Sequence, residues 1–198
     1  MSTNENKPNK PRDFSMKIKS TTETAFQRSI WGRITSEVGE TTVTWIDIEI
    51  PVDCSGNPRG QCVDLIGKDN KGNLVLCELK FGDPGNGSPA EAATQIRLYK
   101  DYATKNASSL GHHKKAETRG TLDWSIVKST STRLVVAANS AYWEYWRQRG
   151  ELEKSSLVGI ECYELPIDTD YFENKKPEGE AYTPEITEER NIWTPVDL

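Results

Sequence analysis

The sequence predicts an α/β domain in which a mixed β-sheet is flanked by helices on both faces. Three consecutive segments in the first half of the chain are rich in β-branched and aromatic residues, which favours an antiparallel meander of strands. A helix-like segment then leads to another buried strand, an order typical of a parallel crossover. The predicted order of elements is αβββαβαβ, and a length of 198 residues fits one domain.

Each predicted element has its own local signal. The first helix is expected over residues 21–38, because Phe26, Ile30 and Ile34 recur every four residues. Ser88-Pro89-Ala90-Glu91 combines a capping box with proline at the first helical position, so a second helix should run from here to about Lys105. A third helix is expected over 141–154. The predicted strands are 42–50, 61–67, 74–81, 134–138 and 157–165.

Charge divides the chain into three parts. The net charge is −5, from 25 Lys and Arg against 30 Asp and Glu, which argues against a protein that coats nucleic acid. We expect a flexible basic arm at 1–20, a folded domain at 21–165 and an acidic tail with several prolines at 166–198. The arm either contacts phosphates or is simply solvated, and the tail either docks a partner, covers a basic cleft or is solvated.

Cysteine usage and hydropathy indicate a soluble, cytoplasmic protein without a membrane segment. The four cysteines include no CxxC pair, so we interpret them as thiols in a reducing compartment. No stretch approaches the roughly 18 apolar residues of a membrane helix. A basic loop follows the second predicted helix and is expected either to contact phosphates or to remain exposed; it contains His112, His113, Lys114, Lys115 and Arg119.

The strongest chemical signal is a pair of acidic residues on the second and third predicted strands. Residues 69–72, Asp-Asn-Lys-Gly, suit a type I turn inside a three-residue hairpin loop, with Gly72 in the left-handed conformation. This register places Asp64 directly opposite Glu78, with β-carbons roughly 5 Å apart. Because strand side chains alternate, Lys80 shares a face with Glu78.

Facing carboxylates repel each other, so this arrangement calls for a compensating cation. Oxygen ligands suit Mg²⁺ or Mn²⁺, which keep several waters and often contact a substrate phosphate. Lys80 would then lie beside the metal and orient water or neutralise charge in the transition state. The alternative interpretation is a solvent-facing strand surface with a Glu–Lys pair and an unrelated aspartate.

These residues resemble the core motif of the PD-(D/E)XK, or restriction-endonuclease-like, nuclease superfamily. The resemblance rests on Asp64, on Glu78-Leu79-Lys80 after thirteen intervening residues, and on Gln95 and Tyr99, which match the QxxxY motif of the RecB-like branch. Val63 stands where the name-giving proline would be. The resemblance implies a restriction-endonuclease-like αβββαβ core spanning about 21–138.

The resemblance also implies a role for each residue. Asp64, Glu78 and the Leu79 carbonyl would be metal ligands, Lys80 the catalytic lysine, and Gln95 and Tyr99 part of the substrate cleft. A further acid on the first helix often assists the metal; Glu23 and Glu37 are the candidates. Glu23 is preferred because it lies at the helix start, although capping is an equally good explanation for it.

The sequence thus predicts a Mg²⁺- or Mn²⁺-dependent nuclease that hydrolyses DNA phosphodiester bonds through Asp64, Glu78 and Lys80. The alternative is a non-catalytic module that retains the fold in order to bind nucleic acid or protein. A homodimer, or a partner docked on the acidic tail, is compatible with either function.

Overall fold

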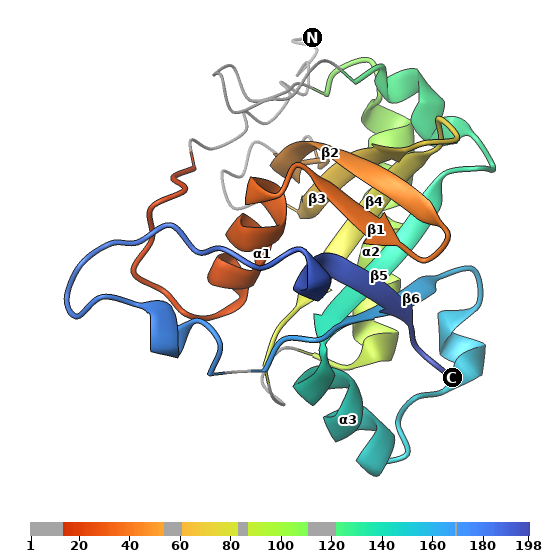
Figure 1. Cartoon of the computed structure of the whole chain (residues 1–198). Helices are drawn as coiled ribbons and strands as arrows, with labels where there is room; N and C mark the ends of the chain where they lie inside the picture. Colours follow the sequence, from red (N-terminus) through yellow and green to blue (C-terminus); the bar gives the residue numbers. More distant parts are fainter. Residues whose placement is uncertain (1–13, 54–60, 83–86, 111–121, 169) are drawn as a thin grey trace, which may run out of the picture.

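A computed structural model describes residues 14–53, 61–82, 87–110, 122–168 and 170–198 (Figure 1). Most of the predicted basic arm and the basic loop from His112 to Arg119 lie outside the described residues. The described chain contains three α-helices and seven strands. The helices are α1 (Glu23–Gly32), α2 (Pro89–Asn106) and α3 (Ser140–Gln148). Short 3₁₀ helices cover Trp124–Lys128, Lys154–Leu157, Glu173–Lys175 and Glu189–Asn191.

The seven strands form one closed sheet in the order β1-β2-β3-β4-β5-β6-β7. Their bounds are Thr35–Val38, Thr41–Pro51, Cys62–Asp69, Leu74–Lys80, Arg133–Asn139, Glu161–Leu165 and Ile192–Pro195. Strands β1 to β4 pair antiparallel, β4 to β6 pair parallel, and β7 is antiparallel to β6. A parallel pairing of β1 with β7 completes the closure.

The predicted fold, a restriction-endonuclease-like αβββαβ core with a mixed sheet flanked by helices, is therefore wrong. The finding that overturns it is the closed barrel, which needs two strands that the sequence did not indicate. Glu37 and Val38 in β1 pair with Ile192 and Trp193 in β7. The local patterns missed this closure because it joins two segments that lie more than 150 residues apart in the chain.

Strand β1 arises where the first helix was expected to continue. Helix α1 ends at Gly32, a residue that weakens a helix interior, and Ile34 has a left-handed φ of 70°. The chain thus turns sharply before Thr35 begins β1. Ile34, predicted to lie on the buried stripe of that helix, is 48% exposed as a result.

Strand β7 belongs to the segment 166–198, which was expected to be an acidic tail outside the folded domain. Trp193 is buried, and its ring stacks on Trp45 of β2 with a centroid distance of 5.4 Å. A buried polar network supports the contact: the Asn191 amide donates to the Thr35 carbonyl at 2.7 Å, and Ser36 donates to Asn191 at 2.9 Å. Packing and hydrogen bonds together hold this segment in the sheet.

The helices lie on opposite sides of the central strands (Figure 1). Alternate residues of β4 belong to different hydrophobic clusters: Leu76 packs in the cluster that contains α2 and α3, whereas Cys77 packs with α1. Helix α2 begins with the predicted capping box between Ser88 and Glu91. Of the helices described, none combines the length and apolar character needed to cross a membrane.

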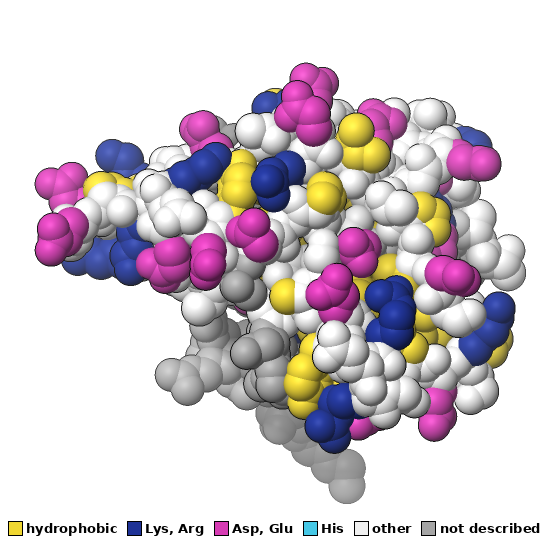
Figure 2. All heavy atoms as spheres, turned by 60° about the horizontal axis from the view of Figure 1, so that its bottom comes forward, with side chains coloured by type: hydrophobic (Ala, Val, Ile, Leu, Met, Phe, Trp, Pro, Cys, Tyr) yellow, Lys and Arg dark blue, Asp and Glu magenta, His cyan; other side chains and the backbone are white. Residues whose placement is uncertain are grey.

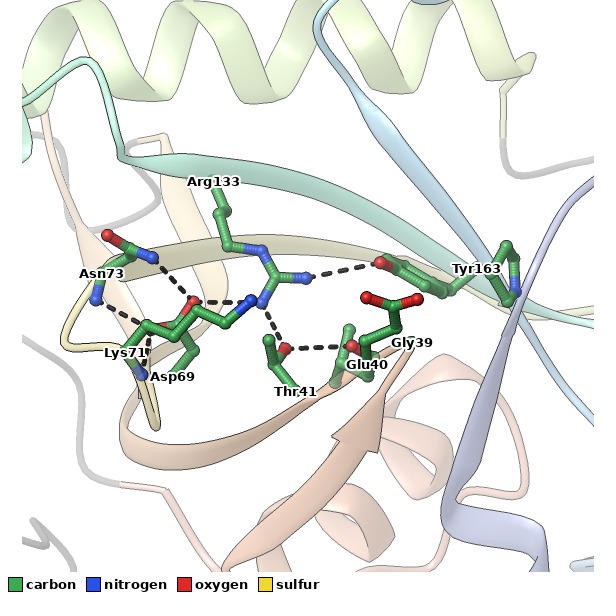
Figure 3. Close-up of a pocket in the computed structure, with 10 residues that line it drawn as sticks. Gly39, Glu40, Thr41, Asp69, Lys71, Asn73, Arg133 and Tyr163 are labelled. Carbon is green, nitrogen blue, oxygen red and sulfur yellow. Dashed lines mark hydrogen bonds and ion pairs between the residues drawn. The ribbon is translucent and has the colours of Figure 1, made fainter.

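Arg133 ties one end of the sheet together (Figure 3). It lies at the start of β5, and its guanidinium contacts Glu161 of β6 at 2.6 Å, Asp69 of β3 at 3.3 Å and Thr41 of β2 at 2.6 Å. The remaining donors reach a second Glu161 oxygen and the Tyr163 hydroxyl. All five guanidinium N–H groups therefore have protein partners. Arg133 also lines an adjacent hollow of about 410 Å³, but it has no free N–H group to offer a ligand there.

Replacing Arg133 should destabilise the protein, because Asp69 would keep a buried carboxylate without its cation. We expect Arg133→Leu to lower the free energy of unfolding by roughly 3 kcal/mol in urea denaturation. Arg149→Leu is the matched control, because Arg149 makes an exposed ion pair with Glu151 and should matter far less. Equal stability of Arg133→Leu and wild type would show that the Arg133 cluster does not hold the strand ends.

The contribution of β7 to the closed sheet should also be measurable as a free energy of unfolding in urea denaturation. Trp193→Ala is expected to cost roughly 3–5 kcal/mol of unfolding free energy, because it removes a fully buried indole from its contact with Trp45. Ile192→Ala in the same strand is the control, since Ile192 is 50% exposed. If both variants unfold at the same urea concentration as wild type, β7 does not close the sheet.

Candidate active site

The β3–β4 hairpin has the register that the sequence predicts. The Asp69 N–H donates to the Asn73 carbonyl at 3.0 Å, and Gly72 has a φ of 85°. Leu65 then faces Cys77, and the same register places Asp64 opposite Glu78. The Asp64 carboxylate also accepts a hydrogen bond from the Leu79 N–H at 2.8 Å. The hairpin therefore fixes Asp64 against the Glu78-Leu79-Lys80 segment.

Glu78 and Lys80 form a buried ion pair beside Asp64. The Lys80 ammonium donates to Glu78 Oε1 at 2.7 Å, and the two residues are 8% and 2% exposed. The other carboxylate oxygen, Glu78 Oε2, is buried and has no hydrogen-bond partner among the described residues. A buried carboxylate oxygen without a partner is costly, so it needs a further positive group or a functional explanation.

Glu23 is the acid of the first helix that joins this group. It lies in the first turn of α1, and its negative charge acts on Asp64, Glu78 and Lys80. Glu37 lies instead on β1, where it accepts hydrogen bonds from Thr42. Of the two candidates, Glu23 is the one placed beside the carboxylate pair.

Gln95 and Tyr99 lie one turn apart on α2 and are joined by a hydrogen bond. Gln95 lines an open hollow of about 380 Å³, whereas Tyr99 is buried. Burial raises the pKa of the Tyr99 hydroxyl, and the charges of Glu78 and Asp64 raise it further. The α2 face thus connects a surface hollow with the carboxylates.

Two neighbouring residues were not identified from the sequence as part of the site. Gln27 donates from its amide to the Asp64 carbonyl at 3.1 Å and to Asp64 Oδ1 at 3.4 Å. Gln27 follows Glu23 by four residues and so shares its helix face, which was an available signal. Tyr142 of α3 donates to the Gly87 carbonyl at 3.0 Å, and the charge of Glu78 acts on its hydroxyl.

Burial and mutual repulsion determine the protonation of the site. Burial, then the charges of Glu78 and Glu23, raise the pKa of Asp64 well above its usual value. Burial also raises the pKa of Glu78, to about 7, against the opposing effect of Lys80. For Lys80, burial favours the neutral form, but the nearby carboxylates outweigh it and raise its pKa. Lys80 therefore stays charged, while Asp64 and Glu78 both bind protons more tightly than free carboxyl groups do.

The donor chemistry of the site fits a hard divalent cation. Within the described ranges, no three His, Cys, Asp or Glu side chains form a metal-binding set, so Glu23 does not complete one with Asp64 and Glu78. The ligands that the family resemblance implies would then be Asp64, Glu78 and the Leu79 carbonyl. Mg²⁺ is commonly bound by one or two carboxylates while it keeps several waters. The unpartnered Glu78 oxygen supplies an available ligand, and oxygen donors suit Mg²⁺ or Mn²⁺.

The raised carboxylate pKa values predict a pH dependence of stability without metal. Since the folded state binds the Glu78 proton more tightly than the unfolded state, the free energy of unfolding should fall as pH rises from 4.5 to about 7. Asp64 adds to the effect in the same direction. We expect Glu78→Gln to flatten this slope in urea denaturation with EDTA. The exposed control Glu144→Gln should keep the wild-type slope, and a wild-type stability that rises over this interval would contradict the prediction.

Comparison of the chain with protein-family models, with curated proteins and with solved structures gives no match.

Proposed function

We propose that this protein is a metal-dependent nuclease that hydrolyses DNA phosphodiester bonds. The proposal is carried by the β3–β4 register, which brings Asp64 opposite Glu78 when it is extended one pair beyond Leu65 and Cys77. Lys80 is hydrogen-bonded to Glu78, and the charge of Glu23 acts on both carboxylates. Three acids and one lysine share this largely buried position, so the site would carry excess negative charge if all three acids were ionised. Such an excess is typical of a site that is completed by a cation.

Asp64, Glu78 and the Leu79 carbonyl would hold Mg²⁺ or Mn²⁺. When bound, the ion would lower the pKa of a coordinated water and neutralise charge on the phosphate. The hydrogen bond from Leu79 N–H fixes Oδ2 of Asp64, and Lys80 fixes Oε1 of Glu78. Both carboxylates are thus oriented by residues of β4, which reduces the reorganisation required for binding.

Lys80 is suited to the phosphate rather than to the metal. Its ammonium remains charged and lies next to Glu78, where it can orient the attacking water or donate to a phosphate oxygen. In the reaction, water forms a new P–O bond while the bond to the leaving sugar oxygen breaks. The charge that develops on the phosphoryl oxygens would be offset by Lys80.

The hollow beside α2 offers a place for the substrate. Gln95 lines it, and the hydrogen bond to Tyr99 links it to the buried carboxylates. On the face in Figure 2, Lys and Arg side chains alternate with Asp and Glu side chains. Mixed charges of this kind favour a small contact with the phosphate backbone over an extended basic surface.

The sequence motif supports the proposed nuclease function, whereas the fold does not. Asp64, Glu78, Lys80, Gln95 and Tyr99 are similar to the PD-(D/E)XK nuclease motifs, while the closed sheet departs from that family's open core. The proposal therefore depends on the site and not on the fold. A net charge of −5 favours the second candidate, a non-catalytic binding module.

Cleavage of single-stranded, duplex and branched DNA should be measured with Mg²⁺, with Mn²⁺ and with EDTA. We expect metal-dependent cleavage by the wild type, and a loss of at least about 100-fold in Asp64→Asn, which weakens a metal ligand, and in Lys80→Ala, which removes the positive charge next to the phosphate. Lys68→Ala is the matched control: Lys68 lies on the same strand as Asp64 but is exposed.

The result separates the two candidate functions. Cleavage that disappears in EDTA and in both site variants, but persists in Lys68→Ala, would establish the nuclease. A wild type that binds DNA without cutting any of the three substrates would favour the binding module. Cleavage of equal rate in Asp64→Asn would exclude this site.

A further inference from the structure

We propose that Gln27 is a positioning residue for Asp64, and that Arg28 sets the orientation of the Gln27 amide. This inference deepens the proposed function and rests on it, because Asp64 is there a metal ligand. It is carried by a chain of contacts that runs from Asp64 through α1 to β2 and the N-terminal residues Phe14 and Ser15.

The first link joins Gln27 to both the backbone and the side chain of Asp64. The Gln27 amide nitrogen donates to the Asp64 carbonyl at 3.1 Å and lies 3.4 Å from Asp64 Oδ1. Gln27 is 4% exposed, so the amide is shielded from water. With Leu79 N–H on Oδ2, both oxygens of the Asp64 carboxylate have a donor.

The backbone conformation of β2 explains why the Asp64 carbonyl accepts a hydrogen bond from the Gln27 side chain. Ile48 pairs with Leu65 and Ile50 with Val63, which places Glu49 opposite Asp64. Glu49 has a φ of 51°, a left-handed conformation that is uncommon for residues other than glycine. A strand residue in this conformation departs from ladder geometry, and the Asp64 carbonyl accepts from Gln27. Such strain is found at functional sites more often than elsewhere.

The second link fixes which way the amide points. Arg28 Nη1 donates to Gln27 Oε1 at 2.7 Å. Because arginine has donors only, it must face the amide oxygen, and the amide nitrogen is therefore directed at Asp64. Arg28 is itself held by Glu49 at 3.2 Å, by the Ser15 carbonyl at 3.3 Å and by the Phe14 ring, whose centroid is 4.7 Å away.

These contacts together fix the orientation of the Asp64 carboxylate. Residues that hydrogen-bond a ligating carboxylate determine its orientation, and their replacement typically weakens metal binding about 10–100-fold. Glu23, on the same face of α1, adds negative charge near the pair, while Gln27 adds a neutral donor. The α1 face thus both attracts a cation and orients one of its ligands.

The test is calorimetric titration of the full chain with Mn²⁺, together with the Mn²⁺ concentration that gives half-maximal DNA cleavage. We expect Gln27→Met, which keeps the length of the side chain, to raise the Mn²⁺ dissociation constant about 10–100-fold. Arg28→Met should shift it in the same direction, because the amide is then free to rotate. Ser29→Ala is the matched control, since Ser29 is buried on the same helix and donates to the Phe26 carbonyl.

Each outcome distinguishes the inference from the function on which it rests. Weaker Mn²⁺ binding in Gln27→Met and Arg28→Met, with wild-type binding in Ser29→Ala, would support the positioning role. Equal dissociation constants in wild type and Gln27→Met would overturn that role even if the wild type cleaves DNA. Tight Mn²⁺ binding without cleavage would overturn the nuclease alone, and a wild type that binds no Mn²⁺ would overturn both.

Discussion

The register of β3 against β4 is the constraint on which the rest of the structure depends. The Asp69–Asn73 hydrogen bond and the left-handed Gly72 set the hairpin turn, and a shift of one residue would exchange the two faces of the hairpin. In the observed register, Leu76 and Ile66 pack in the cluster that contains α2, and extending the register beyond Leu65 and Cys77 brings Asp64 against Glu78. The hydrophobic core and the carboxylate pair are therefore specified by one turn.

Features that depend on residues close together in the chain could be predicted from the sequence. The closure of the sheet by β1 and β7 could not. The hairpin register and the Ser88 capping box depend on residues close in the chain, and both are confirmed. The pairing of β1 with β7 depends on four-residue strands whose partners are distant in sequence. Trp193 gave no periodic signal, because its burial is determined by Trp45 and not by its neighbours.

The same distinction between short-range and long-range contacts applies to the candidate site. The sequence indicated that Asp64, Glu78 and Lys80 would meet, because hairpin geometry alone brings them together. It did not indicate Gln27, whose role depends on how α1 packs across β3 and on the left-handed Glu49 in β2. A helix packing on a sheet sets such contacts by tertiary structure, which local patterns do not encode.

The two ends of the central strands carry charged clusters of opposite character, and the contrast argues for function at one of them. At the start of β5, every donor of Arg133 has a partner, and the carboxylates of Asp69 and Glu161 accept hydrogen bonds from it. At the far end of β4, the charges of Glu78, Asp64 and Glu23 act on Lys80, and Glu78 Oε2 has no hydrogen-bond partner in the part of the chain that the structure describes. A satisfied network stabilises a fold, whereas ionising three acids beside one buried lysine opposes folding unless something else compensates the charge. The end of the sheet that is left uncompensated is therefore the end where a cation has most to contribute.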